Sequence, residues 1–223
     1  MTWPLLEPLK PADRAELLAS ARPRRFRRDE AVFHEGDPGD SLHLVAAGRL
    51  AVRVSTSSGA AATLNVLRAG DYFGELALLR DRPVPLRTAS VIALEPAETL
   101  SLSGKAFHAV CERHPAVERL VAGLLADTVE RLSQRLLEAL YMGVDRRVCR
   151  RLLELAEIYA PAPSSRRGAI IPLTQTHLAD LAGATRPTVN QVLQLLASEG
   201  VISLGRSRVE VLDREALARR ELS

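Results

Sequence analysis

Four residues suited to holding a phosphorylated sugar lie within residues 70–90, GDYFGELALLRDRPVPLRTAS. Gly74 lets the backbone come close to a ligand, and the free N–H groups of a short helical turn after it suit an anion. Arg87 supplies a two-pronged cation for phosphate oxygens. Glu75 is an acceptor for a ribose hydroxyl, and Thr88 adds a hydroxyl near the phosphate or the base. The predicted ligand-binding set is Gly74, Glu75, Leu76, Arg87 and Thr88.

A second segment, QTHLADLAGATRPTVNQVLQ at residues 175–194, has the pattern of a helix-turn-helix. Gly183 falls where the turn needs a left-handed residue. Thr174 and Thr185 precede the two helices as N-caps, and Pro187 lies in the first turn of the second helix, where proline is tolerated. The pattern predicts a DNA-binding element, and the alternative is a helical hairpin that serves only for packing.

In a helix-turn-helix, the second helix enters the major groove with its N-terminal residues over the base edges. Arg186 is the best candidate for a base contact, because its fork can bind a guanine edge. The other candidate base contacts on that helix are amides: Asn190, Gln191 and Gln194. The candidate phosphate contacts are hydroxyl and amide side chains at the two helix starts: Thr174, Gln175, Thr176, Thr185 and Thr188. In the following GRSRVEV segment, a predicted wing hairpin with Gly205 at its tip, the candidate backbone contacts are Arg206 and Arg208.

These two segments need different frameworks. Residues 11–21 have the pattern of a short helix, whereas residues 22–102 alternate apolar and polar side chains in short runs separated by turn signals. Many short strands with regular turns indicate an antiparallel β-sandwich or barrel. Residues 104–113 return to a helical pattern. The ligand segment is therefore expected in a loop of a jelly-roll-like domain.

Residues 116–142 form the longest run with a helical apolar period and no glycine–proline break. Such a stripe lies along one side of an α-helix, about 40 Å long at ~1.5 Å per residue. One interpretation is a core helix buried in its own domain. The interpretation that we adopt is a helix that packs against its copy in a homodimer while joining two domains.

The ligand segment resembles the phosphate-binding cassette of cyclic-nucleotide-binding domains, in particular those of the catabolite activator protein and FNR (CRP/FNR) superfamily. Gly74, Glu75, Arg87 and Thr88 match the family's phosphate- and ribose-binding residues. The resemblance also implies that a hydroxyl of the long helix, Ser133, meets the adenine of cAMP. The order of sensor, long helix and winged helix-turn-helix is that of the superfamily and covers nearly the whole chain.

The resemblance implies an α+β fold: an N-terminal antiparallel β-roll, a long dimerisation helix and a C-terminal winged helix-turn-helix. We expect these at residues 1–115, 116–142 and 143–223. The expected protein is a homodimeric transcription regulator, controlled by cAMP as an allosteric ligand, that binds a two-fold symmetric operator in double-stranded DNA and contacts RNA polymerase. The family's recognition helix carries Arg-Glu and a later Arg, whereas this chain has Arg186, Pro187 and Gln191. The operator should therefore keep a guanine per half-site and differ elsewhere.

Composition narrows the alternatives. The 223 residues carry a net charge of only +3, and the part from residue 143 onward has twelve arginines against nine acids, so charge alone is weak evidence for nucleic acid. Two cysteines and five histidines without ligand spacing give no expectation of a metal or an iron–sulfur cluster. No transmembrane run or signal peptide is evident, so we expect a cytoplasmic protein without membrane contact.

Two other classes of function remain open. One is a ligand-independent CRP/FNR-type regulator, whose β domain serves dimerisation and contact with RNA polymerase. The other is an enzyme, but no nucleophile–base set, dinucleotide fingerprint or Walker loop occurs in motif context. We therefore do not expect catalysis.

Overall fold

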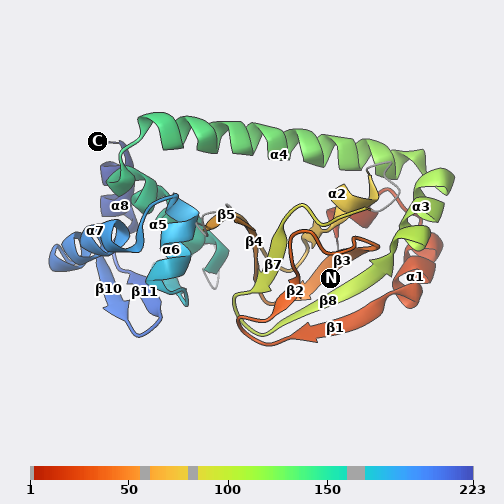
Figure 1. The fold of residues 1–223 in the computed structure, drawn as a ribbon, viewed down its shortest axis with the longest axis horizontal. Coiled ribbons are helices and arrows are strands. Elements are labelled where there is room, and N and C mark those ends of the chain that lie inside the picture. The colour runs from red at the N-terminus through yellow and green to blue at the C-terminus, as the bar shows by residue number, and fades with distance from the viewer. Residues whose placement is uncertain (1–2, 56–60, 80–84, 160–168, 223) are drawn as a thin grey trace. The chain divides into compact units, whose positions relative to one another are not determined.

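The computed structural model describes residues 3–55, 61–79, 85–159 and 169–222. The chain divides into two compact units, residues 1–131 and 132–223 (Figure 1). Each unit has buried apolar residues of its own. Within the described ranges, no helix has both the length and the apolar character needed to cross a membrane. The three-part division predicted above, 1–115, 116–142 and 143–223, stays a prediction.

The first unit is built on two antiparallel sheets. It opens with η1 (Pro4–Leu6) and α1 (Pro11–Ser20). The strands are β1 (Arg22–Phe26), β2 (Ala31–Phe33), β3 (Ser41–Ala47), β4 (Leu50–Ser55), β5 (Ala61–Leu67), β6 (Tyr72–Phe73), β7 (Ser90–Ala93) and β8 (Ala97–Ser103). Their order is β1-β8-β3-β6 in one sheet and β2-β7-β4-β5 in the other (Figure 1). The expected antiparallel β-roll is confirmed, and it includes β1, in which only Phe26 is buried, and the two-residue β6.

Alternation along β3 directs its side chains into two separate cores. Val45 lies with Phe26 and Phe73 in the core between the two sheets. Leu42 and Leu44 lie in a second core, on the other face of the sheet, which the N-terminal segment, α1, α3 (Gly104–Arg113) and the start of α4 complete. Trp3 fixes the N-terminal segment there, because its indole N–H donates a 3.0 Å hydrogen bond to the carbonyl oxygen of Val45. β3 therefore positions residues on both faces of the sheet.

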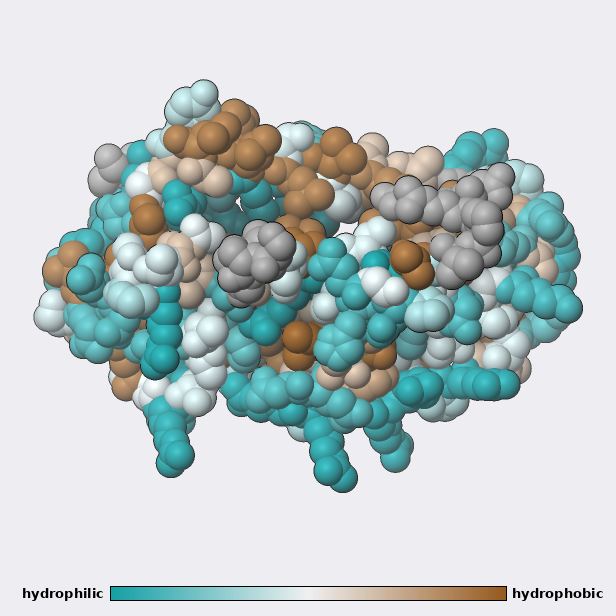
Figure 2. Space-filling view, in the orientation of Figure 1, coloured by the Kyte–Doolittle hydropathy of each residue, from teal (hydrophilic) through white to brown (hydrophobic). Residues whose placement is uncertain are grey.

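Helix α4 spans Pro115–Tyr141, as the apolar period predicted. Its first turns belong to the second core, where Val117 and Val121 are buried. Further along, large apolar side chains are exposed, and Figure 2 shows them gathered over the C-terminal half of the helix. We call this set the α4 apolar row: Val129, Leu132, Leu136, Leu137, Leu140 and Tyr141. The helix is therefore only partly a core helix.

The second unit contains the helix-turn-helix. Its elements are α5 (Val144–Tyr159), β9 (Ala169–Ile171), α6 (Gln175–Ala182), α7 (Arg186–Ser198), β10 (Ile202–Gly205), β11 (Arg208–Val211) and α8 (Arg214–Leu222). The three strands form one sheet in the order β10-β11-β9. β9 is an addition to the predicted wing hairpin. The end of α4 is tied to α5 by Glu138, which pairs with Arg150 at 2.6 Å and with the buried Arg151.

Candidate functional site

Gly74 joins β6 to the one-turn helix α2 (Glu75–Leu78) with a left-handed backbone, φ +90°. Residues other than glycine rarely adopt this backbone conformation. A Cβ atom here would also lie 2.6 Å from Nη1 of Arg87 and 2.9 Å from the carbonyl oxygen of Ser41. Glycine is therefore needed both for the turn and for the close approach of Arg87 to the backbone.

Arg87 is buried, with 5% of its surface exposed. Its Nη1 donates hydrogen bonds to the carbonyl oxygens of Ser41, at 2.7 Å, and Gly74, at 3.2 Å, while Nη2 donates to the Ser41 hydroxyl at 2.9 Å. The guanidinium lies 4.1 Å from the ring centroid of Phe33. Its Nε is buried with no hydrogen-bond partner. In the described part of the chain, no carboxylate lies within 4.0 Å of it, so the charge is buried without an ion pair.

Glu75 is half-buried at the start of α2. Burial raises the pKa of its carboxyl group, and the positive charge of Arg87 opposes this rise without cancelling it. Burial likewise lowers the pKa of Arg87, although Asp40, Glu75 and Asp37 act in the opposite direction. No ion pair joins Glu75 to Arg87 in the described residues. A pair of mutually satisfied charges therefore does not account for this cassette.

The other predicted ligand residues differ in exposure and in the unit to which they belong. Leu76 is an exposed residue of α2, and Thr88, half-buried, follows Arg87 in the chain. The structure thus brings Gly74, Glu75, Leu76, Arg87 and Thr88 into one region of the β-roll. Ser133 is an exposed residue of α4 that belongs to the second unit. Its contact with a ligand stays a prediction.

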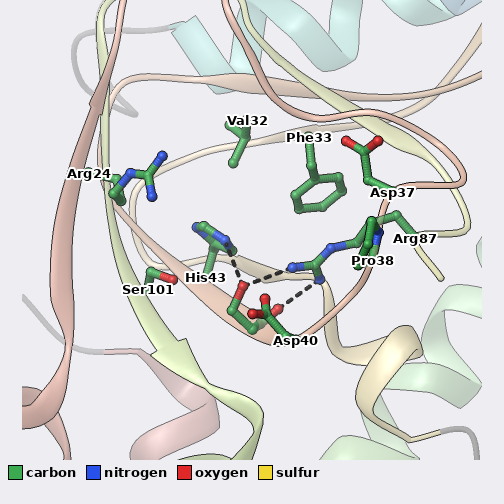
Figure 3. Close-up of a pocket in the computed structure, with 10 residues that line it drawn as sticks. Arg24, Val32, Phe33, Asp37, Pro38, Asp40, His43, Arg87 and Ser101 are labelled. Atoms are coloured by element: carbon green, nitrogen blue, oxygen red, sulfur yellow. Dashed lines mark hydrogen bonds between the residues drawn. The ribbon is translucent and has the colours of Figure 1, made fainter. Parts of the chain in front are cut away.

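A cavity of about 290 Å³ lies next to Arg87 (Figure 3). Arg87 is the only predicted ligand residue that lines it. The other lining residues come from β1, β2, β3, β8 and the loop before β3: Arg24, Val32, Phe33, Asp37, Pro38, Asp40, Ser41, His43 and Ser101. The lining is mostly polar or charged, and Val32, Phe33 and Pro38 are its apolar part.

His43 forms the middle of the cavity's polar wall. Its ring stacks on Phe73 with centroids 5.0 Å apart, and its nitrogens lie 3.2 Å from Oγ1 of Thr99 and 3.4 Å from Oγ of Ser41. Burial, together with the positive charges of Arg87 and Arg24, lowers the pKa of His43 to about 4. The imidazole is therefore neutral at neutral pH. It continues a chain of polar contacts from Arg87 through Ser41 to Thr99.

In the second unit, α6 and α7 have the predicted caps and turn. Thr174 accepts a 3.2 Å hydrogen bond from the backbone N–H of His177, and Thr185 accepts one from Thr188. Gly183 ends α6 in the left-handed conformation, at φ 59°. Pro187 lies in the first turn of α7. Buried Leu178, Ala179, Ala182, Val189 and Leu193 hold the motif together.

The predicted base contacts differ in their surroundings. Arg186, Gln191 and Gln194 are exposed on α7. Asn190 is half-buried, and its Oδ1 accepts a 2.8 Å hydrogen bond from Nε2 of Gln175 on α6. These two amides therefore support each other between the helices, a relationship that the spacing along one helix does not show.

The predicted phosphate contacts lie at the helix starts and on the wing. Thr174, Thr185 and Thr188 take part in capping, and the hydroxyls of Thr185 and Thr188 lie 2.8 Å apart. Thr176 is exposed. The β10–β11 turn consists of Arg206 and Ser207, so Gly205 is the last residue of β10 and not the tip. Arg206 and Arg208 are both exposed on this hairpin.

Two family models match these two regions. Residues 23–114 match the cyclic nucleotide-binding domain, and residues 146–220 match the Crp-like helix-turn-helix domain. The cyclic AMP receptor protein of Thermus thermophilus is 33% identical to this chain, over 99% of this chain and 96% of its own length. The chain belongs to the CRP/FNR superfamily of transcriptional regulators.

Other CRP/FNR proteins are similar to this chain over nearly its whole length. The CRP-like cAMP-activated global transcriptional regulator of Mycobacterium tuberculosis is 29% identical over 97% of this chain and 95% of its own. The crystal structure of the Thermus thermophilus catabolite activator protein is 31% identical, covers 98% of both chains and has a TM-score of 0.54. As a CRP/FNR regulator, this chain combines a cyclic nucleotide-binding domain with a DNA-binding helix-turn-helix. In the ranges that the structure describes, no group of three or more potential ligand side chains is placed to hold a metal ion.

The CRP/FNR cassette does not by itself indicate the cavity lining. Arg24, His43 and Ser101 are far apart in the sequence, and strand pairing brings them together. The register pairs His43 with Ser101 and Arg24 with Thr99. Polar residues at the inward positions of β3 and β8 were the available signal for this site.

Proposed function

We propose that this chain is a homodimeric, sequence-specific transcription regulator controlled by cAMP bound in its β-roll. The observation that carries the ligand part is Arg87, a guanidinium with 5% exposure and no carboxylate partner in the described residues. Burying an unpaired charge costs several kcal/mol, and an anionic ligand would offset that cost. Two relatives, one named as a cAMP-activated global transcriptional regulator and one as a cyclic AMP receptor protein, support the choice of cAMP.

The cassette residues then have distinct roles toward the nucleotide. Arg87 would bind the cyclic phosphate, helped by the backbone N–H groups at the start of α2 and the hydroxyl of Thr88. Glu75 would accept from the ribose hydroxyl, and Leu76 would pack against the sugar or base. Ser133 on α4 would meet the adenine.

The α4 apolar row supports a homodimer. Leu136 and Leu140 are 60% and 63% exposed and lie four positions apart, so both lie on the same side of the helix. Contiguous exposed apolar surface on a soluble domain marks an interaction site. In a dimer with two-fold symmetry the same row would meet its copy, and the two recognition helices would read a two-fold symmetric operator.

Control by cAMP requires that the nucleotide bind the DNA-competent state better than the other state. A ligand that touches both the cassette and α4 would have this differential affinity, because α4 continues into the second unit. Arg186, with Gln191, Gln194 and Asn190, would contact the bases, and Thr174, Gln175, Thr176, Thr185, Thr188, Arg206 and Arg208 the phosphates. RNA polymerase would be the further partner, in the cytoplasm.

A ligand-independent regulator is the second candidate, and one observation favours it. The two Nη atoms of Arg87 already donate to Ser41 and Gly74, so the cassette is partly satisfied without a ligand. In that case the β-roll would serve dimerisation and contact with RNA polymerase.

Titration calorimetry of nucleotide-stripped protein separates the two candidates. Micromolar binding of cAMP, with weaker binding of cGMP, supports the sensor. Measuring operator affinity with and without cAMP then tests the control. If neither nucleotide binds while the operator is bound fully, the ligand-independent regulator is the correct function.

A further inference from the structure

The cavity of Figure 3 has a cation at each end. Arg87 lies at one end and Arg24 at the other, with His43 between them. The proposed function uses only the Arg87 end. Arg24, on the edge strand β1, forms no ion pair in the described part of the chain, and its one close aromatic neighbour is Phe26, at 6.0 Å. The Arg24 end of the cavity therefore has a cation without an assigned role.

Sheet geometry explains why Arg24 faces this cavity. Directly opposed residues of an antiparallel pair point to the same face of the sheet. Arg24 opposes Thr99, and His43 opposes Ser101 on the same strand β8. Thr99 reaches Nδ1 of His43 at 3.2 Å, so all four side chains lie on the inner face. The arrangement places the guanidinium of Arg24 and the hydroxyl of Ser101 at one wall of the cavity.

The two carboxylates of the cavity lie at the other end. Figure 3 shows Asp37 and Asp40 on the side of Arg87. Asp37 already accepts a 2.7 Å hydrogen bond from the backbone N–H of His34, and Asp40 acts electrostatically on Arg87. The charge of Arg24 is thus not balanced within its own end. After burial, the charges of Arg87 and Arg24 lower the pKa of His43, and Asp40 acts in the opposite direction.

We infer that Arg24 and Ser101, with His43 as the wall between them and Arg87, form a second oxyanion subsite, which holds the second phosphate group of a nucleotide that carries two. The inference rests on the proposed nucleotide site at Arg87 and extends it. A guanidinium and a hydroxyl are the donors that phosphate oxygens prefer. cAMP occupies only the Arg87 end, whereas a nucleotide with two separate phosphate groups occupies both ends.

Adenosine 3′,5′-bisphosphate is the matched probe, because it has the nucleoside of cAMP and two separate phosphate groups. Titration calorimetry of nucleotide-stripped protein would compare the two ligands. We expect the bisphosphate to bind at least roughly tenfold more tightly than cAMP, which is the effect of one added charge-assisted hydrogen bond. Equal affinities of the wild-type protein for the two ligands would overturn the subsite and leave the cAMP site standing.

Variants assign the effect to Arg24. Arg24→Gln should remove the advantage of the bisphosphate and leave cAMP binding unchanged. Arg25→Gln is the control, because Arg25 is the next residue of β1, points to the other face and pairs with Glu98 at 2.7 Å. Equal losses in both variants would indicate long-range attraction and contradict the subsite. Ser101→Ala should weaken the bisphosphate severalfold and provides a second test if Arg24→Gln unfolds.

Two further outcomes distinguish the identity of the ligand from the existence of the subsite. If the bisphosphate binds in an Arg24-dependent way and cAMP does not bind, the subsite stands and the cAMP assignment is wrong. Inorganic pyrophosphate titrated into protein saturated with cAMP tests a free anion as the source. Arg24-dependent binding there would show two separate ligands and overturn the assignment to one nucleotide with two phosphates.

Discussion

Nη1 of Arg87 donates a 2.7 Å hydrogen bond to the carbonyl oxygen of Ser41, and Nη2 donates to the hydroxyl of the same residue at 2.9 Å. One side chain thus ties the loop before β7 to the start of β3. The guanidinium that is predicted to bind phosphate is also part of the framework. Ligand binding and the stability of the β-roll therefore depend on the same residue.

Arg87→Ala should abolish cAMP binding and also lower stability. The cassette alone predicts that this change leaves the fold intact, but the structure shows three hydrogen bonds that the variant loses. Buried acceptors left unsatisfied cost about 1–3 kcal/mol. Calorimetry and urea unfolding of the same samples measure both effects. Arg68→Ala, which removes an exposed arginine of the same unit, is the control. Unchanged nucleotide affinity in Arg87→Ala would rule out the cassette as the ligand site.

His43 should make the stability of the first unit depend on pH. Its pKa is about 4 in the folded protein and 6.5 in the unfolded chain, so the unfolded state binds more protons between these values. The stabilisation is complete above pH 6.5 and is lost as the pH falls toward 4. The full effect corresponds to about 3 kcal/mol.

The measurement is the free energy of unfolding of the wild type and of His43→Gln at pH 7 and pH 5. The carboxylates titrate in both proteins, so the difference between the two isolates His43. We expect the wild type to lose more stability than the variant. Parallel pH dependences would show that His43 titrates normally.

Local periodicity and turn chemistry predicted much of this molecule. α4 has a long apolar stripe, and the helix-turn-helix has Thr174, Gly183 and Thr185 at the required spacings, so each could be located from neighbouring residues alone. β1 could not, because four of its five residues, including Arg24, are exposed and only Phe26 is buried. β9 is short and pairs with β11 across more than thirty residues.

The cavity escaped prediction for a related reason. Its polar wall joins Arg24, His43 and Ser101, which lie on three strands and meet only through the β1-β8-β3 pairing. A cassette is a local sequence pattern, whereas the lining of a β-roll depends on register between distant strands. The Gln175–Asn190 hydrogen bond is another non-local contact that spacing on one helix does not reveal.

Leu136→Glu should dissociate the proposed dimer. A carboxylate in the α4 apolar row would be buried without a partner at a two-fold seam, and two copies would repel each other. Sedimentation velocity should show a dimer for the wild type and a monomer for the variant. Gln134→Glu adds the same charge at an exposed polar position on a different side of the helix and should remain dimeric. A monomeric wild type would contradict the proposed dimer interface at the α4 apolar row.

Gln175→Ala should change base preference without a direct base contact. Gln175 donates a 2.8 Å hydrogen bond to Oδ1 of Asn190, which orients that amide. Without it the Asn190 side chain gains freedom, so preference should relax at the base pair that Asn190 contacts. Operator selection with wild type, Gln175→Ala and Asn190→Ala measures this, and the two variants should lose preference at the same position. A loss in Gln175→Ala that is equal for all sequences would make Gln175 a phosphate contact only.

Arg186→Ala should weaken binding to the cognate operator by about 1–3 kcal/mol and relax the preference for guanine at one position per half-site. Arg186 is the exposed first residue of α7, where a recognition helix meets the base edges. Arg206→Ala on the β10–β11 hairpin is the comparison, because a phosphate contact should weaken all sequences equally and reduce the salt dependence by about one ion. Binding to the operator and to random DNA, each at several salt concentrations, separates the two. If Arg186→Ala loses the same affinity on both DNAs, Arg186 contacts phosphate, and base recognition must come from Gln191, Gln194 or Asn190.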